Sequence, residues 1–266
     1  MATVNGAPAS PEALQSLALT NYGHFTTMRV ADGAVRGLSL HLARLVDDCR
    51  AVFGTALDPD RVRAFVRQEV GAHGAHGTHG APVTVRVTVF DPALDLAHPG
   101  AGAEPAILVT TRAAGDAPPP PLRAKRFTVA REAAAVKHVG LFNQLRLRRQ
   151  AQLAGFDDAL FVAADGRIAE GGTWNIGFVD AAGTVVWPRA EVLPGVTMRL
   201  LQAAHRPTAT APVTAAALPA MRAAFATNAA IGVRTVAAID DLAFATDDPV
   251  LDELRRTYAQ LPGEPL

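Results

Sequence analysis

The sequence predicts a mixed α/β chain of the α+β type, arranged as two lobes. Short runs rich in valine and threonine, such as VTVRVTVF at 83–90, alternate along the chain with amphipathic helical stretches. Four consecutive prolines at 118–121 favour extended polyproline geometry, which spaces two lobes semi-rigidly. We therefore expect a small N-terminal α+β domain over 1–117, a linker over 118–123 and a larger domain over 124–266.

The N-terminal lobe begins with a short edge strand, ATVNG at 2–6, which ends in an Asn-Gly turn. A helical or irregular stretch at 10–19 follows, and then a β-hairpin turns at Asp32-Gly33. One amphipathic helix ends at Gly54, and a second begins at Asp58-Pro59. Their apolar faces comprise Leu42, Leu45, Val46, Cys49, Val52 and Phe53 in the first, and Val62, Phe65, Val66 and Val70 in the second. Strands at 83–90 and 106–111 complete this lobe.

The larger lobe opens with a predicted strand at 127–132 and a helix within 140–156. We expect this helix to turn Phe142, Leu145 and Leu153 inward and Arg146, Arg148 and Arg149 outward. A meander of strands follows at 157–163, 166–170, 174–180 and 185–188. After a helix that starts near LPGVT, the segment 223–240 supplies two more strands. A last helix opens at Asp248-Pro249, with Val250, Leu251, Leu254 and Tyr258 as its apolar face.

Composition excludes several functional classes. The chain has 266 residues, 49% of them hydrophobic, so it can bury a large core. The formal charge is zero, which gives no global field toward nucleic acid or an acidic membrane. No apolar run reaches the length of a membrane span, and the N-terminus lacks a signal-peptide pattern, so we expect a cytoplasmic protein. The single cysteine, Cys49, excludes an intrachain disulfide framework and is expected in the core.

A histidine-rich stretch, GAHGAHGTHGAP at 71–82, carries His73, His76 and His79. Its glycines predict a mobile loop, and no acid or thiol lies close by in sequence. Because no rigid element fixes the imidazole rings, we expect no metal site there.

Three segments from Lys137 onward carry chemistry. The chain has only two lysines, Lys125 and Lys137, against twenty-three arginines, so an amine has two candidates. Lys137 follows an apolar AAAV run, and apolar surroundings lower the pKa of a lysine toward the nucleophilic form. Glu170 precedes two glycines that let a backbone approach a flat ring, and Thr197 stands at a helix start suited to an anion. Taken singly, each has a plainer interpretation: a surface lysine, a turn carboxylate or a helix cap.

An amine, an acid and a phosphate-sized loop in this order fit pyridoxal 5′-phosphate (PLP). The segments KHVGLFNQLRLRRQ, EGGTWNIGF, LPGVTMRLL and HLARL resemble those of the fold-type IV PLP enzymes, the class IV aminotransferases, over about Val4 to Val236. The resemblance implies a larger lobe with a β-barrel-like sheet and flanking helices. It also implies a homodimer, with Lys137 as the Schiff-base lysine and Glu170 as the partner of the pyridine nitrogen.

The resemblance assigns further residues. It makes Arg44, Val196 and Thr197 phosphate ligands, although Arg44 alone would be interpreted as a solvated helix arginine. Additional cofactor contacts are expected from Asn175, Asn228 and Ala229, and substrate contacts from Tyr22, Phe25, Thr27, Trp174 and Asn228.

Within the family the sequence points two ways. GHFTTMRV and KHVGLFNQ look like aminodeoxychorismate lyase, whereas EGGTWNI and LPGVT look more like branched-chain aminotransferases. We expect transamination between an amino acid, or another primary amine, and a 2-oxo acid. A lyase that releases pyruvate is the first alternative, and a non-catalytic relative is the second.

Overall fold

The computed structural model describes residues 2–75, 81–115 and 119–266, which divide into two compact units. Unit 1 comprises Met1–Asp116, Val136–Gly140 and Pro262–Leu266, and unit 2 comprises Ala117–Ala135 and Leu141–Leu261. The α+β class and the barrel-like sheet expected for the larger lobe are confirmed. The division differs from the predicted one, because two short segments of the predicted larger domain belong to unit 1.

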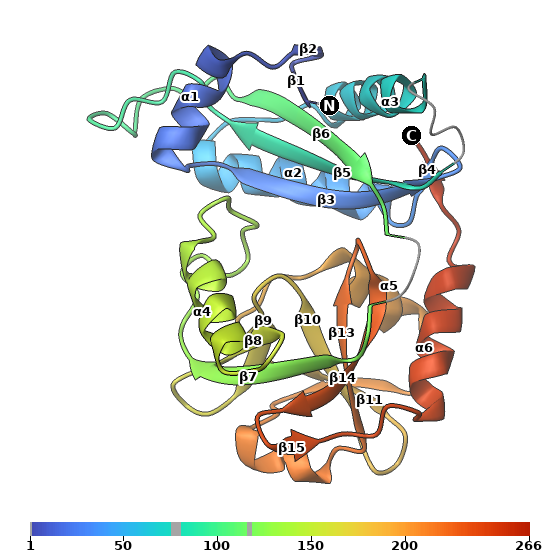
Figure 1. Cartoon of the computed structure of the whole chain (residues 1–266). Helices are drawn as coiled ribbons and strands as arrows, with labels where there is room; N and C mark the ends of the chain where they lie inside the picture. Colours follow the sequence, from blue (N-terminus) through green and yellow to red (C-terminus); the bar gives the residue numbers. More distant parts are fainter. Residues whose placement is uncertain (1, 76–80, 116–118) are drawn as a thin grey trace. The chain divides into compact units, whose positions relative to one another are not determined.

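Unit 1 is built on an antiparallel seven-stranded sheet in the order β16-β4-β3-β5-β6-β1-β2. Its elements are β1 (Ala2–Val4), β2 (Ala7–Pro8), α1 (Pro11–Thr20), β3 (His24–Ala31), β4 (Ala34–Val35), α2 (Leu38–Phe53), α3 (Pro59–Ala75), β5 (Val83–Phe90), β6 (Ala106–Ala113) and β16 (Glu264–Pro265) (Figure 1). The predicted Asn-Gly and Asp-Gly turns are present: Asn5, Gly6, Asp32 and Gly33 all have positive φ.

The strand β5 shows how the two faces of this sheet differ. Its four valines lie in the core that α2 and α3 cover, together with the buried Cys49. Thr84, Arg86 and Thr88 alternate with these valines and therefore lie on the opposite face. Leu14 and Leu17 of the helix α1 pack against this second face beside Phe90, Ala106 and Leu108. Part of the second face thus carries polar side chains, and among them are several residues of the candidate site.

Unit 2 contains a closed six-stranded barrel in the order β10-β13-β14-β7-β8-β9, because β9 also pairs with β10. Its elements are β7 (Leu122–Thr128), α4 (Phe142–Leu153), β8 (Asp158–Val162), β9 (Ile168–Gly171), β10 (Asn175–Val179), β11 (Val185–Pro188), α5 (Val196–Ala204), β12 (Thr208–Ala211), the 3₁₀ helix η1 (Ala215–Ala220), β13 (Ala223–Asn228), β14 (Gly232–Ile239), β15 (Leu242–Ala243) and α6 (Pro249–Gln260).

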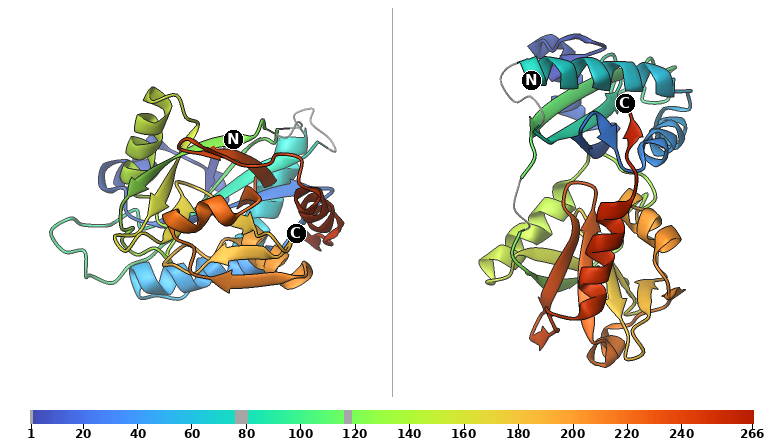
Figure 2. Two further views of the ribbon diagram at one scale, coloured as in Figure 1. Left: turned by 90° about the horizontal axis from the view of Figure 1, so that it is seen from below. Right: turned by 90° about the vertical axis from the view of Figure 1, so that its right-hand side faces the viewer.

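Alternating side chains of the barrel strands form two cores. Ile176, Phe178 and Ala224 belong to one cluster, whereas Phe225 faces a second cluster with α5 and α6. Figure 2 shows α6 running beside β14, against which it packs. No helix among the described residues is long and apolar enough to span a membrane.

Two local predictions were wrong because tertiary pairing overrides local sequence signals. The strand expected at 127–132 begins earlier, at Leu122, within the predicted linker, because its main chain pairs with β8 and β14. The expected loop at His73 is instead the last turn of α3, and its Nδ1 lies 3.3 Å from Thr111 Oγ1. His76 and His79 lie outside the described residues.

The inward face predicted for α4 was also wrong. Phe142, Leu145 and Leu153 are 74%, 54% and 71% exposed, whereas Gln144, Leu147 and Ala151 are buried. Apolar residues lie on more than one side of this helix, so periodicity alone could not select the buried side. The ion pair between Arg148 and the buried Asp158 connects the side of α4 that faces the barrel to the start of β8.

This orientation of α4 can be tested by truncating two leucines of the same helix. Leu147→Ala removes a side chain that is 4% exposed and should lower the free energy of unfolding by about 2–4 kcal/mol. Leu145→Ala removes a side chain that is 54% exposed and should cost less than about 1 kcal/mol. Urea denaturation of both variants measures the difference, and equal losses would contradict the orientation.

Candidate active site

Lys137 belongs to unit 1, where the short segment 136–140 adds to the edge of β3. The Phe25 N–H donates to the Lys137 carbonyl at 2.8 Å, and the Val139 N–H donates to the Gly23 carbonyl at 2.9 Å. The Lys137 N–H donates to Asp48 Oδ2 at 3.2 Å. Both main-chain polar groups of the lysine are therefore fixed, which restricts where its side chain can reach.

The Lys137 amine lies over the ring of Phe25, with Nζ 4.7 Å from the ring centroid. The guanidinium of Arg86 stacks on the same ring at 3.6 Å. Arg86 lies opposite Thr27 in the register of β3 and β5. The structure thus brings together the predicted residues Phe25, Thr27 and Lys137.

Arg86 was not among the predicted site residues. Its Nε donates to Thr88 Oγ1 at 3.2 Å, and burial lowers its pKa. Among the residues that the structure describes, no carboxylate lies within ion-pair distance of Arg86. The signal in the sequence was an arginine on the threonine side of an otherwise apolar strand.

Arg44 lies in a buried polar cluster between α2 and β3, so the solvated-arginine interpretation is wrong. Its Nη2 donates to Thr26 Oγ1 at 2.6 Å, and the same hydroxyl lies 2.7 Å from His41 Nδ1. Burial, followed by the charges of Arg44 and Lys137, lowers the pKa of His41 well below its usual value. Burial raises the pKa of Asp48 to about 6.

Tyr22 is placed apart from the polar face of the sheet. Its hydroxyl donates to the Val52 carbonyl at 2.9 Å, and its ring packs edge-on against Phe53. Tyr22 is nevertheless 44% exposed. The structure therefore supports a contact between Tyr22 and the end of α2, and its predicted role toward substrate stays a prediction.

In unit 2, Glu170 is a buried carboxylate on β9, 4% exposed, rather than a turn residue on a solvated edge. Arg131 Nη1 lies 2.5 Å from Oε1, and the Leu193 N–H donates to Oε2 at 3.1 Å. Asn175 Nδ2 donates to the Leu193 carbonyl at 2.7 Å and to Oε2 at 3.4 Å. These donors hold the buried carboxylate in a fixed position.

Asn175 therefore supports Glu170 and the loop before α5, which is a role that its sequence position did not reveal. Arg131, the partner of Glu170, was also missed. The sequence places Arg131 and Glu132 side by side in the predicted strand at 127–132. It does not indicate which of the two side chains faces inward.

The helix α5 begins at the two residues predicted to bind phosphate. Val196 and Thr197 are 4% and 1% exposed, and no side chain caps this helix end. Thr197 Oγ1 is buried and has no hydrogen-bond partner among the described residues. Thr227 Oγ1, on the neighbouring strand β13, is also buried and also lacks a hydrogen-bond partner among the described residues. Unmatched hydroxyls and main-chain donors at a helix N-terminus suit an anion.

Asn228 and Ala229 lie at the turn between β13 and β14. The Asn228 Oδ1 accepts the N–H groups of Ala230 and Ile231 at 3.0 and 2.9 Å, so this side chain shapes the turn. Asn228 also lines a small pocket with Trp174, Thr227 and Arg234. The structure thus joins two of the predicted substrate residues, Trp174 and Asn228.

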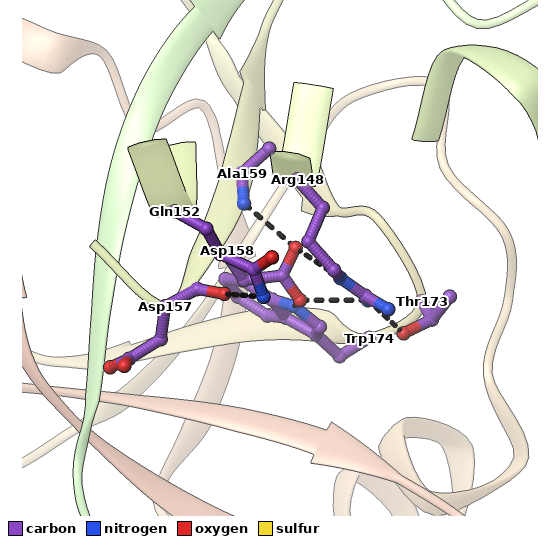
Figure 3. Close-up of polar contacts among 7 residues, drawn as sticks. All are labelled: Arg148, Gln152, Asp157, Asp158, Ala159, Thr173 and Trp174. Atoms are coloured by element: carbon purple, nitrogen blue, oxygen red, sulfur yellow. Dashed lines mark hydrogen bonds and ion pairs between the residues drawn. The ribbon is translucent and has the colours of Figure 1, made fainter. Parts of the chain in front are cut away.

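Trp174 is held by a network around Asp158, shown in Figure 3. The indole Nε1 donates to Asp158 Oδ2 at 2.9 Å, and Arg148 donates to both carboxylate oxygens. Arg148 also reaches Thr173 Oγ1 at 2.7 Å. A Cβ at Gly171 would overlap the indole, so a glycine is needed directly after Glu170.

The donor sets fit PLP when the two units are considered separately. Unit 1 supplies an amine beside an aromatic ring, the buried Arg44 and the partly buried Arg86. Unit 2 supplies a buried carboxylate at Glu170 and, at Thr197, a buried hydroxyl that has no partner among the described residues at a helix start. These groups match an aldehyde, a protonated ring nitrogen and a phosphate.

The loop before α5 can be tested through Gly195. An alanine Cβ there would overlap Asn175 Oδ1, which displaces the side chain that links Glu170 to Leu193. Gly195→Ala should therefore weaken PLP binding by about tenfold or more, as measured by absorbance titration. Gly102→Ala is the control, because nothing lies within 4 Å of its Cβ. Wild-type affinity in Gly195→Ala would contradict this account of the loop.

Comparisons with solved structures show the same fold in several enzymes. A hypothetical aminotransferase from Mycobacterium tuberculosis, in its apo form, is 17% identical, with a TM-score of 0.81 over 97% of both chains. The fold IV-transaminase CpuTA1 from Curtobacterium pusillum is 21% identical, with a TM-score of 0.81 over 96% of this chain and 91% of that one. A putative 4-amino-4-deoxychorismate lyase from Legionella pneumophila is 21% identical, with a TM-score of 0.80 over 96% of each chain.

Other structures of the M. tuberculosis protein hold PLP, or pyridoxamine phosphate with α-ketoglutarate, in agreement with the predicted cofactor. The comparison with curated proteins found no match. The family model for amino-transferase class IV matches residues 23–239, which is most of the chain. The protein therefore belongs to the class IV aminotransferase family.

Proposed function

We propose that this protein is a PLP-dependent aminotransferase that transfers an amino group from an amino acid, or another primary amine, to a 2-oxo acid. The observation that carries the proposal is the pair of cations on one aromatic ring. Lys137 Nζ lies over Phe25, and Arg86 stacks on the same ring without a carboxylate partner among the described residues. An amine for the cofactor and a cation for a substrate carboxylate are thus both present in unit 1.

Several residues of the chain would hold the cofactor. When bound, PLP supplies an aldehyde that reacts with amines and a ring that accepts electrons. Lys137 would hold the aldehyde, and Glu170 would face the ring nitrogen and keep it protonated. The N–H groups of Val196 and Thr197, the Thr197 hydroxyl and Arg44 would bind the phosphate. Asn175 and Arg131 would keep Glu170 in place.

The protein groups also move the proton in this proposal. Lys137 Nζ, as a free neutral amine, would take the proton from the substrate Cα and deliver it to the C4′ carbon of the cofactor. Its fixed main chain limits the positions that Nζ can occupy, which favours transfer between two defined atoms. Arg131 and the Leu193 N–H would hold the Glu170 carboxylate in place during this transfer.

Arg86 favours an amino acid over an amine without a carboxylate. Its guanidinium is already oriented by the Phe25 ring and by Thr88, so binding a carboxylate costs little side-chain entropy. The structures of other family members support this substrate class. One of them, a branched-chain amino acid aminotransferase that is 20% identical to this chain, is complexed with N-(5′-phosphopyridoxyl)-L-glutamate.

The experiment that tests the function is a half-reaction. The PLP-loaded protein is mixed with single amino acids in the absence of any 2-oxo acid. An aminotransferase converts its cofactor to pyridoxamine 5′-phosphate, which chromatography measures, and the visible absorbance falls. Release of pyruvate from aminodeoxychorismate, with the cofactor unchanged, would favour the lyase that the GHFTTMRV and KHVGLFNQ segments resemble. A protein that binds no PLP would be the non-catalytic relative.

A second prediction concerns Arg86. Arg86→Met should raise KM for amino acids by about tenfold to a hundredfold, since a charge-assisted contact to the carboxylate is lost. The KM for an amine without a carboxylate should change little. Arg112→Met, at an exposed position on the neighbouring strand β6, is the matched control. Equal effects on both substrate classes would show that Arg86 does not bind the carboxylate.

A further inference from the structure

We propose that Asp48 is a positioning residue for Lys137, which fixes the peptide N–H of the lysine and adds a negative charge to the surroundings of its amine. This inference rests on the proposed role of Lys137. It assigns to Asp48 a function that neither the sequence patterns nor the family likeness suggested.

The geometry places Asp48 on the side of α2 that faces β3. His41, Arg44 and Asp48 follow one another at helical spacing, and all three are buried. Asp48 Oδ2 accepts the Lys137 N–H at 3.2 Å. Because the Phe25 N–H donates to the Lys137 carbonyl, Asp48 completes the attachment of this residue to unit 1.

The charge of Asp48 is balanced by few groups. Arg44 and Asp47 act on it from α2, and Lys137 acts on it from the 136–140 segment, which also carries His138. Burial lowers the pKa of the two nearby histidines, to about 4 for His24 and well below its usual value for His41, so both are neutral near pH 7. Arg44 and Lys137 are therefore the two positive charges that act on Asp48, with Arg44 the stronger of the two.

A neutral acceptor, such as an amide oxygen, would bind the Lys137 N–H equally well. The hydrogen bond alone therefore does not explain why position 48 carries a carboxylate. Burial raises the pKa of Asp48 from 3.8 to about 6, which means that ionising it in this position is unfavourable. At and above pH 7 the group is nevertheless ionised, and its charge favours the protonated form of Lys137. As pH falls through about 6, Asp48 takes up a proton and this electrostatic support is lost.

Competitive labelling of the two lysines tests the electrostatic part of this proposal. Full-length protein without added cofactor is treated with trace acetic anhydride across a pH series, and mass spectrometry of peptides follows Lys137 and Lys125. Asp48→Asn keeps an acceptor for the N–H and removes the charge. The labelling curve of Lys137 should therefore move to lower pH by about one unit, with Lys125 unchanged as the internal reference.

Asp47→Asn is the matched control, since Asp47 is the next residue on the same helix and its side chain is 74% exposed. An unmoved Lys137 curve in Asp48→Asn, or an equal shift in Asp47→Asn, would overturn the electrostatic role. Because no cofactor takes part, this result is independent of whether the protein is an aminotransferase.

Hydrogen exchange tests the positioning part. Asp48→Ala removes the acceptor, so the Lys137 amide should exchange about tenfold faster than in the wild type. Asp48→Asn should exchange at nearly the wild-type rate, because its amide oxygen still accepts the bond. Circular dichroism verifies that both variants are folded. Equal exchange in Asp48→Ala and the wild type would show that Asp48 does not hold the peptide.

Discussion

The attachment of Lys137 to the edge of β3 is the constraint on which the proposed chemistry depends. A lysine side chain has four rotatable bonds, so a mobile backbone would leave its amine poorly placed. Here the N–H is held by Asp48 and the carbonyl by the Phe25 N–H, while the Phe25 ring lies beneath the amine. The chain leaves unit 2 at the start of the 136–140 segment and returns to unit 2 after it. The lysine therefore belongs to unit 1, which also contains Arg44 and Arg86.

In unit 2, hydrogen-bond donors fix a buried carboxylate in place, as the main-chain contacts fix Lys137 in unit 1. Arg131, Asn175 and the Leu193 N–H all bind Glu170, and Asn175 also holds the Leu193 carbonyl. The loop that leads into α5 is therefore coupled to the acid, and a change at one should disturb the other. The Asp158 network fixes Trp174 over Gly171, next in sequence to Glu170.

Much of the fold could be predicted from the sequence because its local signals are strong. Three features have the predicted form: the strand β5, the Asp-Gly turn before β4 and the amphipathic helix α2. Long-range pairing could not be predicted, and it moved the 136–140 and 262–266 segments into unit 1. The buried side of α4 was missed because apolar residues lie on more than one side of this helix, so periodicity alone could not select the buried one. Arg86, Arg131 and Asp48 were missed because they interact with Phe25, Glu170 and Lys137, respectively, which lie far away in sequence. The expected homodimer and cytoplasmic location stay predictions.

The central claim is that Lys137 is the residue that binds the PLP aldehyde, and covalent trapping tests it most directly. The protein is saturated with PLP, reduced with borohydride and digested, and peptide mass spectrometry locates the phosphopyridoxyl group. With only two lysines in the chain, the result is unambiguous. We expect near-complete modification of Lys137 and little at Lys125. Modification of Lys125 instead, or an unmodified Lys137 under saturating PLP, would contradict it.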